Sequence, residues 1–513
     1  MRTDGTADFT VPWWRMPPRH PHLLEISAWP WLARLSRKTG TPITLGSVPE
    51  DVWDGYAQQG FDVIYLMGVW QRSVIGRELA LAHPGLRAEY DRVLPGWTND
   101  DVPGSPYCIA DYVPDARMGG WAGFDAAREA LRARGMQLMV DFVPNHTAFD
   151  HPWVQAHPER YVRGSADAQR QRPEDFRRVG SELIACGRDP HFPPWTDVAQ
   201  LNYFNPETRT AMIDVLRTIR EHADGVRCDM AMLVLNGVFE RTWRRDLGGE
   251  WPVPGAEFWP AATREVQDLL YLAEVYWDLE WTLQQQGFDF TYDKRLLDRL
   301  HAGSAEGVRG HLRAEPDYAN RSARFLENHD EPRSAVQLGE RLPAAATLLA
   351  TLPGMRFFYD GQMDGARLRA PVQLGRWPDE PVDPKTRRLY DRLLSISREE
   401  IFHRGTWKLL EVADAGNSSH SPLVAWEWIQ ENERVVVIVN LGGAPADGYV
   451  PLRELPADGR CAFADRLTDA TFEVAAETTL QSPGLYVRLD GGRSHVLSIA
   501  VSARVPASEY PAA

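Results

Sequence analysis

The stretch Gly225-Val226-Arg227-Cys228-Asp229-Met230 decides what fold and what chemistry this chain is expected to have. An apolar run with helical spacing precedes it, so a helix followed by a short strand is predicted here. Residues two apart on a strand point the same way, which places Arg227 and Asp229 on one face. A carboxylate beside a guanidinium stays ionised at neutral pH. At the end of a strand, such a carboxylate is either a nucleophile or half of a structural ion pair, and the six residues alone leave both open.

The composition is that of an ordinary globular protein. Of the 513 residues, 43% are hydrophobic and 25% are charged, as is typical of such proteins. The net charge of -15 argues against nucleic acid or an anionic membrane as a partner. The 19 tryptophans suit core packing, and flat aromatic faces also suit the apolar faces of sugar rings. The tryptophans are therefore weak evidence for a carbohydrate ligand.

The cysteines and the N-terminus bear on the compartment. Cys108, Cys186, Cys228 and Cys461 show no C-x-x-C spacing, so neither a zinc site nor a disulfide framework is indicated. The sequence has no run of about 18 apolar residues that could span a membrane. No apolar segment of the signal-peptide kind follows its first residues. We therefore expect a reduced, cytoplasmic protein with no membrane partner.

Apolar strand candidates alternate with helical segments. The candidates lie near residues 24, 63, 138, 225, 270, 288, 324 and 356, with the first expected at Leu23–Trp29 and the sixth at Gly287–Phe290. Helices are predicted at 48–59, 123–134, 205–222, 342–352 and 383–401. Eight strands with intervening helices predict an α/β fold, the (β/α)8 TIM barrel. An open doubly wound sheet is the alternative, but no Gly-rich phosphate loop supports it.

Two segments interrupt this alternation. Residues 147–200 are rich in Pro, Arg, Asp and His and are too long for an ordinary connection, so a small domain inserted after the third strand is predicted. From residue 406, short strands without helices predict a C-terminal all-β sandwich domain. The predicted division is a barrel in 1–146 and 201–405, an inserted domain in 147–200, and a sandwich domain in 406–513.

Polar side chains follow four of the predicted strands. In chain order these are Asp141, Asn145 and His146 after the third strand, Arg227 and Asp229 on the fourth, Glu274 after the fifth, and His329 and Asp330 after the seventh. In a TIM barrel the active site forms at this end of the strands. A single histidine or carboxylate there is more often structural. Several carboxylates and two histidines at one barrel mouth instead point to catalysis.

Paired carboxylates at short range are what glycoside hydrolysis requires. One attacks the anomeric carbon and the other, with a raised pKa, protonates the leaving oxygen; a retaining enzyme holds them about 5 Å apart. The pKa rises when several carboxylates share a dry cleft. Arg227 would keep Asp229 ionised, whereas Glu274 has no adjacent cation in the sequence. Glu274 is therefore the expected acid.

Four segments of the chain resemble the four signature regions of the α-amylase family, glycoside hydrolase family 13. Asp141–His146 (DFVPNH) resembles D-x-x-x-N-H, and Gly225–Asp229 (GVRCD) resembles G-x-R-x-D. Glu274 at a strand end resembles the third region, and Phe325–Asp330 (FLENHD) resembles F-x-x-N-H-D. The insertion after the third strand and the all-β C-terminal part also match. The resemblance covers roughly residues 20 to 500.

The resemblance implies catalytic roles for three carboxylates. Asp229 would be the nucleophile, Glu274 the general acid/base, and Asp330 a transition-state stabiliser that binds sugar hydroxyls. The resemblance implies that no cofactor is required. The family often binds a structural calcium through the asparagine of its first region, which is Asn145 here, so a calcium site at Asn145 is left open.

The resemblance also implies residues that bind the sugar. Tyr107, in a Y-x-x-x-D-Y context, would be the aromatic platform under the reacting sugar. The alternative for Tyr107 is a loop tyrosine packed on the barrel rim. His146 and His329 would hydrogen-bond the same sugar, and Arg227 would orient Asp229.

Two positions depart from the family pattern. Many α-amylases carry Lys-His three and four residues past the nucleophile, where this chain has Met232 and Leu233. This departure argues against a standard endo-acting starch α-amylase. Members with a closed glucosyl pocket often have an aspartate three residues before the platform tyrosine, where this chain has Gly104.

We therefore expect a retaining α-glycoside hydrolase that cleaves α-glucosidic bonds, on α-1,4 gluco-oligosaccharides, through a covalent intermediate. The alternatives are an α-glucan transglycosylase, or an enzyme of the same family active on sucrose- or trehalose-type disaccharides. A non-catalytic sugar-binding barrel is more remote. A metal-dependent hydrolase using Asp141, His146, Asp229 and His329 lacks H-x-H or H-E-x-x-H spacing. The expected partner is an α-linked glucose oligosaccharide or disaccharide, and the sequence leaves the oligomeric state open.

Overall fold

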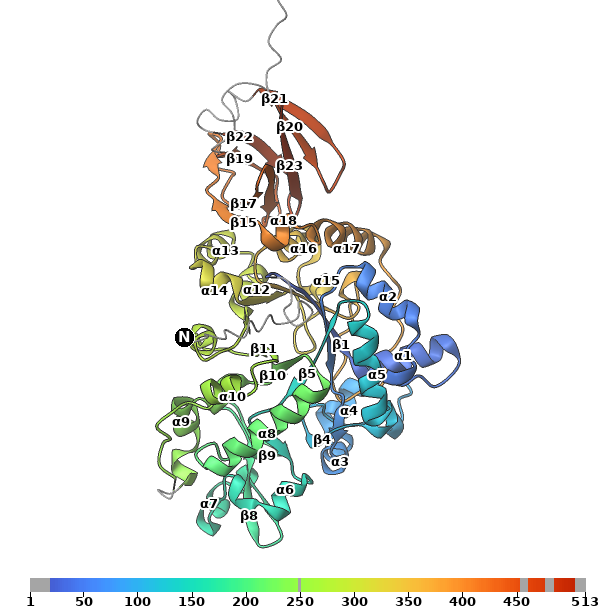
Figure 1. The fold of residues 1–513 in the computed structure, drawn as a ribbon, viewed down its shortest axis with the longest axis vertical. Helices are drawn as coiled ribbons and strands as arrows, with labels where there is room; N and C mark the ends of the chain where they lie inside the picture. The colour runs from blue at the N-terminus through green and yellow to red at the C-terminus, as the bar shows by residue number, and fades with distance from the viewer. Residues whose placement is uncertain (1–18, 248–250, 453–459, 476–483, 503–513) are drawn as a thin grey trace, which may run out of the picture. The chain divides into compact units, whose positions relative to one another are not determined.

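The structure, a computed structural model, describes residues 19–247, 251–452, 460–475 and 484–502 (Figure 1). The first residues of the chain, on which the expectation about targeting depends, lie outside the described ranges. The chain divides into two compact units. Unit 1 comprises Met1–Tyr292 and Leu368–Glu380, and unit 2 comprises Asp293–Arg367 and Pro381–Ala513.

Parallel strands form a closed barrel with the order β1-β14-β13-β12-β11-β10-β5-β2. In chain order the strands are β1 (His22–Ser27), β2 (Val63–Met67), β5 (Gln137–Phe142), β10 (Gly225–Cys228), β11 (Leu270–Ala273), β12 (Phe290–Tyr292), β13 (Ser322–Phe325) and β14 (Met355–Tyr359). The prediction of a TIM barrel is confirmed, and the open doubly wound sheet is wrong. Every residue of β2 and β5 is buried, which explains why these strands read as apolar throughout.

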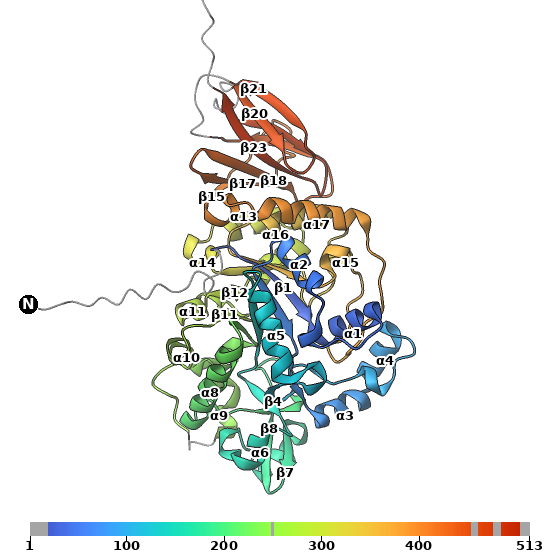
Figure 2. The same ribbon diagram turned by 45° about the vertical axis from the view of Figure 1, so that its right-hand side comes forward.

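The predicted helices are present, with shifted ends. They are α2 (Glu50–Gln58), α5 (Gly120–Arg132), α8 (Pro206–His222), α16 (Leu342–Thr351) and α17 (Pro384–Ser397). The last predicted helix is too long, because α17 ends at Ser397 and α18 (Ile401–Arg404) is separate. In unit 1, α5 packs beside β5 and α8 (Figure 2). The other described α-helices are α1 (Ala28–Thr39), α3 (Val74–Ala82), α4 (Pro84–Val93), α6 (Pro152–Ala156), α7 (Ala166–Gln171), α9 (Asn236–Leu247), α10 (Trp259–Glu265), α11 (Glu280–Gln285), α12 (Lys294–His301), α13 (Ala305–Leu312), α14 (Pro316–Asn320) and α15 (Ser334–Gln337).

Two predicted strand boundaries are wrong. The first strand ends at Ser27 and α1 begins at Ala28, because Pro30 lies in the first turn of α1, where its missing N–H costs no hydrogen bond. The sixth strand is β12 (Phe290–Tyr292). Gly287 precedes it in a turn with φ 104°, a left-handed backbone that glycine adopts without strain.

Short strands also lie in the loop between β2 and β5 and in the 147–200 segment. The loop holds the ribbon of β3 (Trp70–Arg72) and β4 (Ile109–Pro114). The segment forms a sheet with the order β6-β9-β8-β7, from β6 (His146–Ala148), β7 (Phe176–Val179), β8 (Glu182–Gly187) and β9 (Trp195–Gln200) (Figure 2). The boundaries at 147 and 200 stay predictions.

The last part of unit 2 consists of strands in two sheets. The larger has the order β15-β17-β18-β23-β20-β21 and the smaller β16-β19-β22. The strands are β15 (Thr406–Leu410), β16 (Ala413–Asp414), β17 (Leu423–Gln430), β18 (Glu433–Asn440), β19 (Ala446–Val450), β20 (Arg460–Asp465), β21 (Thr471–Ala475), β22 (Leu485–Leu489) and β23 (Ser494–Ser502). Apolar residues of both sheets form one core. The boundary at 406 stays a prediction.

The tryptophans of β17 belong to a second buried face. Trp426 and Trp428 are 0% exposed, and the indole Nε1 of Trp428 donates a hydrogen bond of 2.7 Å to the carbonyl of Thr351 in α16. Both views show α16 and α17 beside these strands (Figures 1 and 2). These side chains therefore pack the strands onto the helices and are not accessible to a sugar.

The structure bears on the expectations about membrane spans and about cysteines. Across these ranges no helix is both long enough and apolar enough to cross a membrane. The four cysteines are thiols that form no disulfide, and all are buried.

Candidate active site

Arg227 lies at the centre of a buried charged cluster in unit 1. Its side chain is 0% exposed. Its Nη1 donates to Asp229 Oδ1 over 2.6 Å, and its Nη2 lies 2.9 Å from Glu274 Oε2 as an ion pair that is not aligned as a hydrogen bond. Glu274, which has no cation beside it in the sequence, therefore has one beside it in the structure. The sequence does not show this contact, because β10 and β11 are neighbours in the barrel but are far apart along the chain. Met230, just after β10, and Glu274, just after β11, are 44 residues apart.

The backbone of β10 and β11 fixes both carboxylates. Cys228 and Ala273 are paired and are the last residues of β10 and β11, so Asp229 and Glu274 directly follow the two strands. The amide of Glu274 donates to the carbonyl of Cys228 over 3.0 Å. Met230 then takes a left-handed backbone with φ 41°, which is uncommon outside glycine. This turn aims the Met230 amide at Glu274 Oε2, 2.7 Å away.

Two tyrosine rings enclose the Arg227 guanidinium. Its Cζ lies 5.2 Å from the ring centre of Tyr107 and 5.7 Å from that of Tyr292, within cation–π range. Nε of Arg227 also donates to the Tyr292 hydroxyl over 3.2 Å. Burial alone would lower the pKa of Arg227, but Glu274 and the surrounding tyrosines outweigh burial and raise it. Tyr107 is half-buried, so one part of it is open to a ligand.

Asp141 is held by its neighbours and has no exposed surface. The Tyr65 hydroxyl donates to its Oδ1 over 2.5 Å, and the amide of Gly68 donates to its Oδ2 over 2.7 Å. Burial, followed by the charge of Asp141, raises the pKa of Tyr65. The carboxylate is thus used to tie β2 to β5, which weakens the metal-hydrolase alternative that gave Asp141 a reacting role.

His146 lies close to Tyr107 and is 4% exposed. Burial lowers its pKa to about 4, although Asp197 and a hydrogen bond to the Tyr107 backbone oppose that shift. Its Nδ1 lies 3.3 Å from the Asn145 side-chain nitrogen. Since that nitrogen can only donate, Nδ1 accepts. His146 is therefore a neutral imidazole at neutral pH.

The residues around Asn145 do not fit a calcium ion. Both its side-chain oxygen and its backbone oxygen accept hydrogen bonds of 2.9 Å from the amide nitrogen of Gln200. A donor thus occupies the position that a cation would take, whereas calcium requires six to eight oxygen ligands. Among the described residues, no group of three or more His, Cys, Asp or Glu side chains could hold a metal ion.

Asp330 and His329 lie in unit 2, after β13. His329 is 2% exposed, and its Nε2 lies 2.9 Å from Asp330 Oδ2. The Asp330 amide donates to Asn328 Oδ1 over 2.9 Å. The Asp330 side chain is 48% exposed, so a strand-end turn presents this carboxylate to solvent.

Sequence reasoning missed two tyrosines of the cluster. The Tyr276 hydroxyl donates to Glu274 Oε1 over 2.8 Å, and Tyr292 contacts Arg227. The i, i+2 relation that linked Arg227 with Asp229 could also have linked Glu274 with Tyr276. Tyr292 was missed because the sixth strand was placed too early, so that its true last residue was not considered a strand end.

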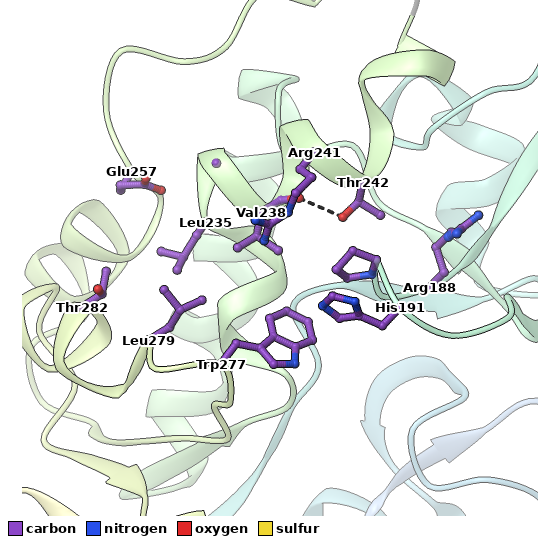
Figure 3. Close-up of a pocket in the computed structure, with 12 residues that line it drawn as sticks. Arg188, His191, Leu235, Val238, Arg241, Thr242, Glu257, Trp277, Leu279 and Thr282 are labelled. Carbon is purple, nitrogen blue, oxygen red and sulfur yellow. Dashed lines mark hydrogen bonds between the residues drawn. The ribbon is translucent and has the colours of Figure 1, made fainter.

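A pocket of about 750 Å³ lies in unit 1 beside the segment that follows Glu274 (Figure 3). Trp277 and His191 line it, with ring centres 4.9 Å apart. Trp277 and Asp278 both have φ 65°, a strained conformation for residues other than glycine, which is often found at functional sites. Trp277 is three residues from Glu274, so the two Cα atoms are at most about 11 Å apart.

The rest of this pocket combines apolar and charged side chains. Its lining includes Leu235, Val238 and Leu279, together with Arg188, Arg241 and Glu257 (Figure 3). Met232 and Leu233, which stand where many α-amylases have Lys-His, are 0% and 3% exposed. They are packed in the core, so the polar groups near this side of Glu274 come from other segments.

Comparison with known proteins relates this barrel to α-amylases. The chain is 27% identical over 366 residues to α-amylase MalA of Haloarcula japonica, covering 69% of this chain and 50% of that protein. It is 22% identical over 299 residues to α-amylase 3 of Dictyoglomus thermophilum, covering 54% of this chain and 57% of that protein. No protein-family model matches the sequence. The chain spans about half the length of these two curated relatives.

A solved structure shows the same fold. The maltogenic α-amylase AmyB of Thermotoga neapolitana superposes with a TM-score of 0.67 at 19% identity, covering 94% of this chain and 99% of that one. The closed parallel barrel, with a carboxylate directly after each of two neighbouring strands, is the architecture of an α-amylase-like TIM barrel. In sequence and in fold the chain is thus similar to α-amylases, the enzymes of glycoside hydrolase family 13.

Proposed function

We propose that this protein is a retaining α-glycoside hydrolase that cleaves α-glucosidic bonds, with α-1,4 gluco-oligosaccharides as substrates. The observation that carries the proposal is the pair of carboxylates, Asp229 and Glu274, on one buried guanidinium. Similarity to α-amylases supports the substrate class. Tyr107, whose ring centre lies 5.2 Å from the carbon of that guanidinium, supplies an aromatic surface near the carboxylates.

The charge balance of the cluster supports different roles for the two carboxylates. Arg227 balances one of two negative charges, so a proton on the second carboxylate relieves the remaining repulsion. Asp229 receives the aligned hydrogen bond from Arg227 and is the proposed nucleophile. Glu274, whose Oε1 meets the Tyr276 hydroxyl, is the proposed acid that protonates the leaving oxygen and later deprotonates water.

The proposed reaction has two steps. Asp229 Oδ attacks the anomeric carbon as the glycosidic C–O bond breaks, and the proton of Glu274 passes to the leaving oxygen. Water, deprotonated by Glu274, then displaces Asp229 and gives a product of the original α configuration. From the motif that contains them, we propose that Asp330 and His329 bind hydroxyl groups of the reacting sugar. The neutral His146 and Tyr107 are proposed to contact the same sugar.

The pocket at Trp277 is the proposed position of the leaving-group part of the substrate. It begins three residues after Glu274, and the acid must lie against the leaving oxygen. The Trp277 and His191 rings offer flat apolar faces, and Arg188, Arg241 and Glu257 offer hydrogen-bonding groups at the rim (Figure 3). An acceptor sugar in the same pocket would compete with water, which keeps α-glucan transglycosylation as a second candidate.

Proton NMR of maltoheptaose incubated with wild-type protein and with the Asp229→Asn variant tests the proposal. Shorter oligosaccharides that first appear as α anomers, in the wild type only, are expected. Longer products would indicate transfer. A matched control is Asp214→Asn, a 60% exposed carboxylate on α8, which should keep wild-type activity. First-formed β anomers, or undiminished turnover by Asp229→Asn, would contradict the proposed mechanism.

A further inference from the structure

Three buried oxygen atoms converge on one side-chain nitrogen where β6 begins and its partner strand β9 ends. The Nε2 atom of Gln200 lies 2.9 Å from the backbone oxygen of Asn145, 2.9 Å from its Oδ1, and 3.1 Å from the backbone oxygen of Leu201. Since Nε2 carries two hydrogens, two of these oxygens share one of them. Gln200 and Leu201 are 0% exposed and Asn145 is 1% exposed. We call these three residues the amide clamp.

The hydrogen-bond partners fix which atom of the Gln200 amide points where. An oxygen in the position of Nε2 would face three other oxygens and would be repelled by all of them. On the other side, Oε1 of Gln200 accepts from the Asn145 side-chain nitrogen over 3.2 Å and from the Arg188 amide over 3.4 Å. Asn145 and Gln200 therefore form a reciprocal amide pair.

The same arrangement of oxygens would suit a cation if the nitrogen were absent. Calcium binds oxygens at 2.3–2.6 Å and prefers carboxylates among its ligands. The distances of 2.9–3.1 Å here are those of N–H···O hydrogen bonds. No carboxylate belongs to the amide clamp, and a neutral amide fills its centre.

The amide clamp also determines how His146 is held. The Asn145 side-chain nitrogen that donates to Gln200 lies 3.3 Å from His146 Nδ1. His146 in turn hydrogen-bonds the backbone of Tyr107, and His146 pairs with Gln200 in the β6–β9 ladder. Gln200 thus reaches the proposed sugar-binding residues through Asn145 without touching the substrate itself.

We propose that the Gln200 carboxamide replaces a structural cation. It links the segment between β5 and β6 to the end of β9, and it positions His146. The protein therefore requires no calcium for stability or activity. Gln200 is on this account a positioning residue. The stability part does not depend on the proposed function. The positioning part rests on it, because it concerns residues proposed to bind the sugar.

Thermal unfolding with EDTA and with added CaCl2 tests the stability part. The wild type should unfold at the same temperature in both. Gln200→Glu places a carboxylate oxygen against three oxygens, so it should be less stable in EDTA and should regain stability in CaCl2. Gln200→Leu should be less stable in both. Gln362→Glu, at a buried glutamine of unit 2 that binds Tyr390, is the matched control and should show no calcium response.

A wild type whose unfolding temperature falls in EDTA or rises in CaCl2 would overturn the proposal. So would a Gln200→Glu variant that responds to calcium no more than Gln362→Glu does. Both readouts are independent of catalysis, so they stand even if the protein hydrolyses no glucan.

Steady-state kinetics on maltoheptaose test the positioning part. Gln200→Leu should raise KM by more than it lowers kcat, and CaCl2 should restore the KM of Gln200→Glu but not that of Gln200→Leu. A merely structural role would change the amount of folded enzyme, and hence kcat, with KM unchanged. That result would overturn the positioning role and leave the stability part intact. Absence of all wild-type turnover would instead count against the proposed function.

Discussion

Two buried polar clusters in unit 1 differ in how completely their groups are paired. In the amide clamp, a neutral side chain meets every oxygen that faces it. In the cluster around Arg227, one guanidinium serves two carboxylates, and a left-handed residue, Met230, supplies a further donor. A fully satisfied neutral network mainly fixes structure. An unbalanced buried charge is costly and is retained where it can do chemistry. On the proposed function, charge balance is what distinguishes the structural amide clamp from the reactive cluster around Arg227.

Removing a carboxylate from the charged cluster should have the largest effect on activity. Asp229→Asn removes the proposed nucleophile and should abolish turnover. Glu274→Gln removes the acid and should lower kcat on maltoheptaose by about 10²–10⁴-fold, the usual contribution of acid–base catalysis. Circular dichroism should show both variants folded. A Glu274→Gln variant within about threefold of the wild type, well below that range, would disprove its role.

Removing the shared cation should have the largest effect on stability. Arg227→Met leaves two buried carboxylates without their guanidinium, which should lower the free energy of unfolding by about 3–5 kcal/mol. Adding Glu274→Gln removes one of the two negative charges, so the double variant should be more stable than Arg227→Met alone. Urea unfolding of the four proteins of this cycle measures the coupling. Purely additive effects would contradict the charge balance proposed for this cluster.

Acid should destabilise the protein through His146. Burial holds its folded-state pKa at about 4, below the ordinary value of 6.5, so the unfolded chain binds the proton more tightly. The stabilisation is complete above about pH 6.5 and is lost as the pH falls toward 4; it amounts to on the order of 3 kcal/mol. Burial lowers the pKa of His151 to about 4 as well, with the same sign. Urea unfolding between pH 4 and 7 should show a shallower pH dependence for His146→Asn than for the exposed control His191→Asn.

The smallest expected effect concerns the pocket. Trp277→Ala should lower kcat/KM for maltoheptaose relative to that for α-glucosyl fluoride by about tenfold, corresponding to about 1.4 kcal/mol of lost contact with the leaving group. Fluoride is a leaving group that does not reach the pocket. Trp281→Ala is the matched control, because Trp281 is 45% exposed and is not among the residues lining the pocket. An unchanged ratio for Trp277→Ala would place the leaving group elsewhere.

The sequence predicted the features that depend on local pattern. Apolar strands and the residues that end them were recognisable because a parallel strand buried on both faces has few polar positions. Arg227 and Asp229 could be paired because the i, i+2 rule acts within one strand. The α1 boundary was missed because an apolar Ala-Trp after a strand fits strand and helix equally well.

Contacts between strands were beyond a single sequence. The ion pair of Arg227 with Glu274 requires β10 and β11 to be neighbours in register. The amide clamp requires the end of the inserted segment to return to Asn145, 55 residues earlier. Asn145 was a candidate calcium ligand because the resemblance to the α-amylase family implied that role, and only the position of Gln200 shows that its oxygens are already engaged.

The most direct test is to look for the covalent intermediate on Asp229. α-Glucosyl fluoride needs no acid to expel its leaving group, so the Glu274→Gln variant should form the glycosyl-enzyme and hydrolyse it slowly for lack of a base. Mass spectrometry of the quenched reaction should show one glucosyl group on the peptide that contains Asp229. The Asp229→Asn, Glu274→Gln double variant should show none. A label on another residue, or fluoride release with no intermediate and inversion of configuration, would contradict the account.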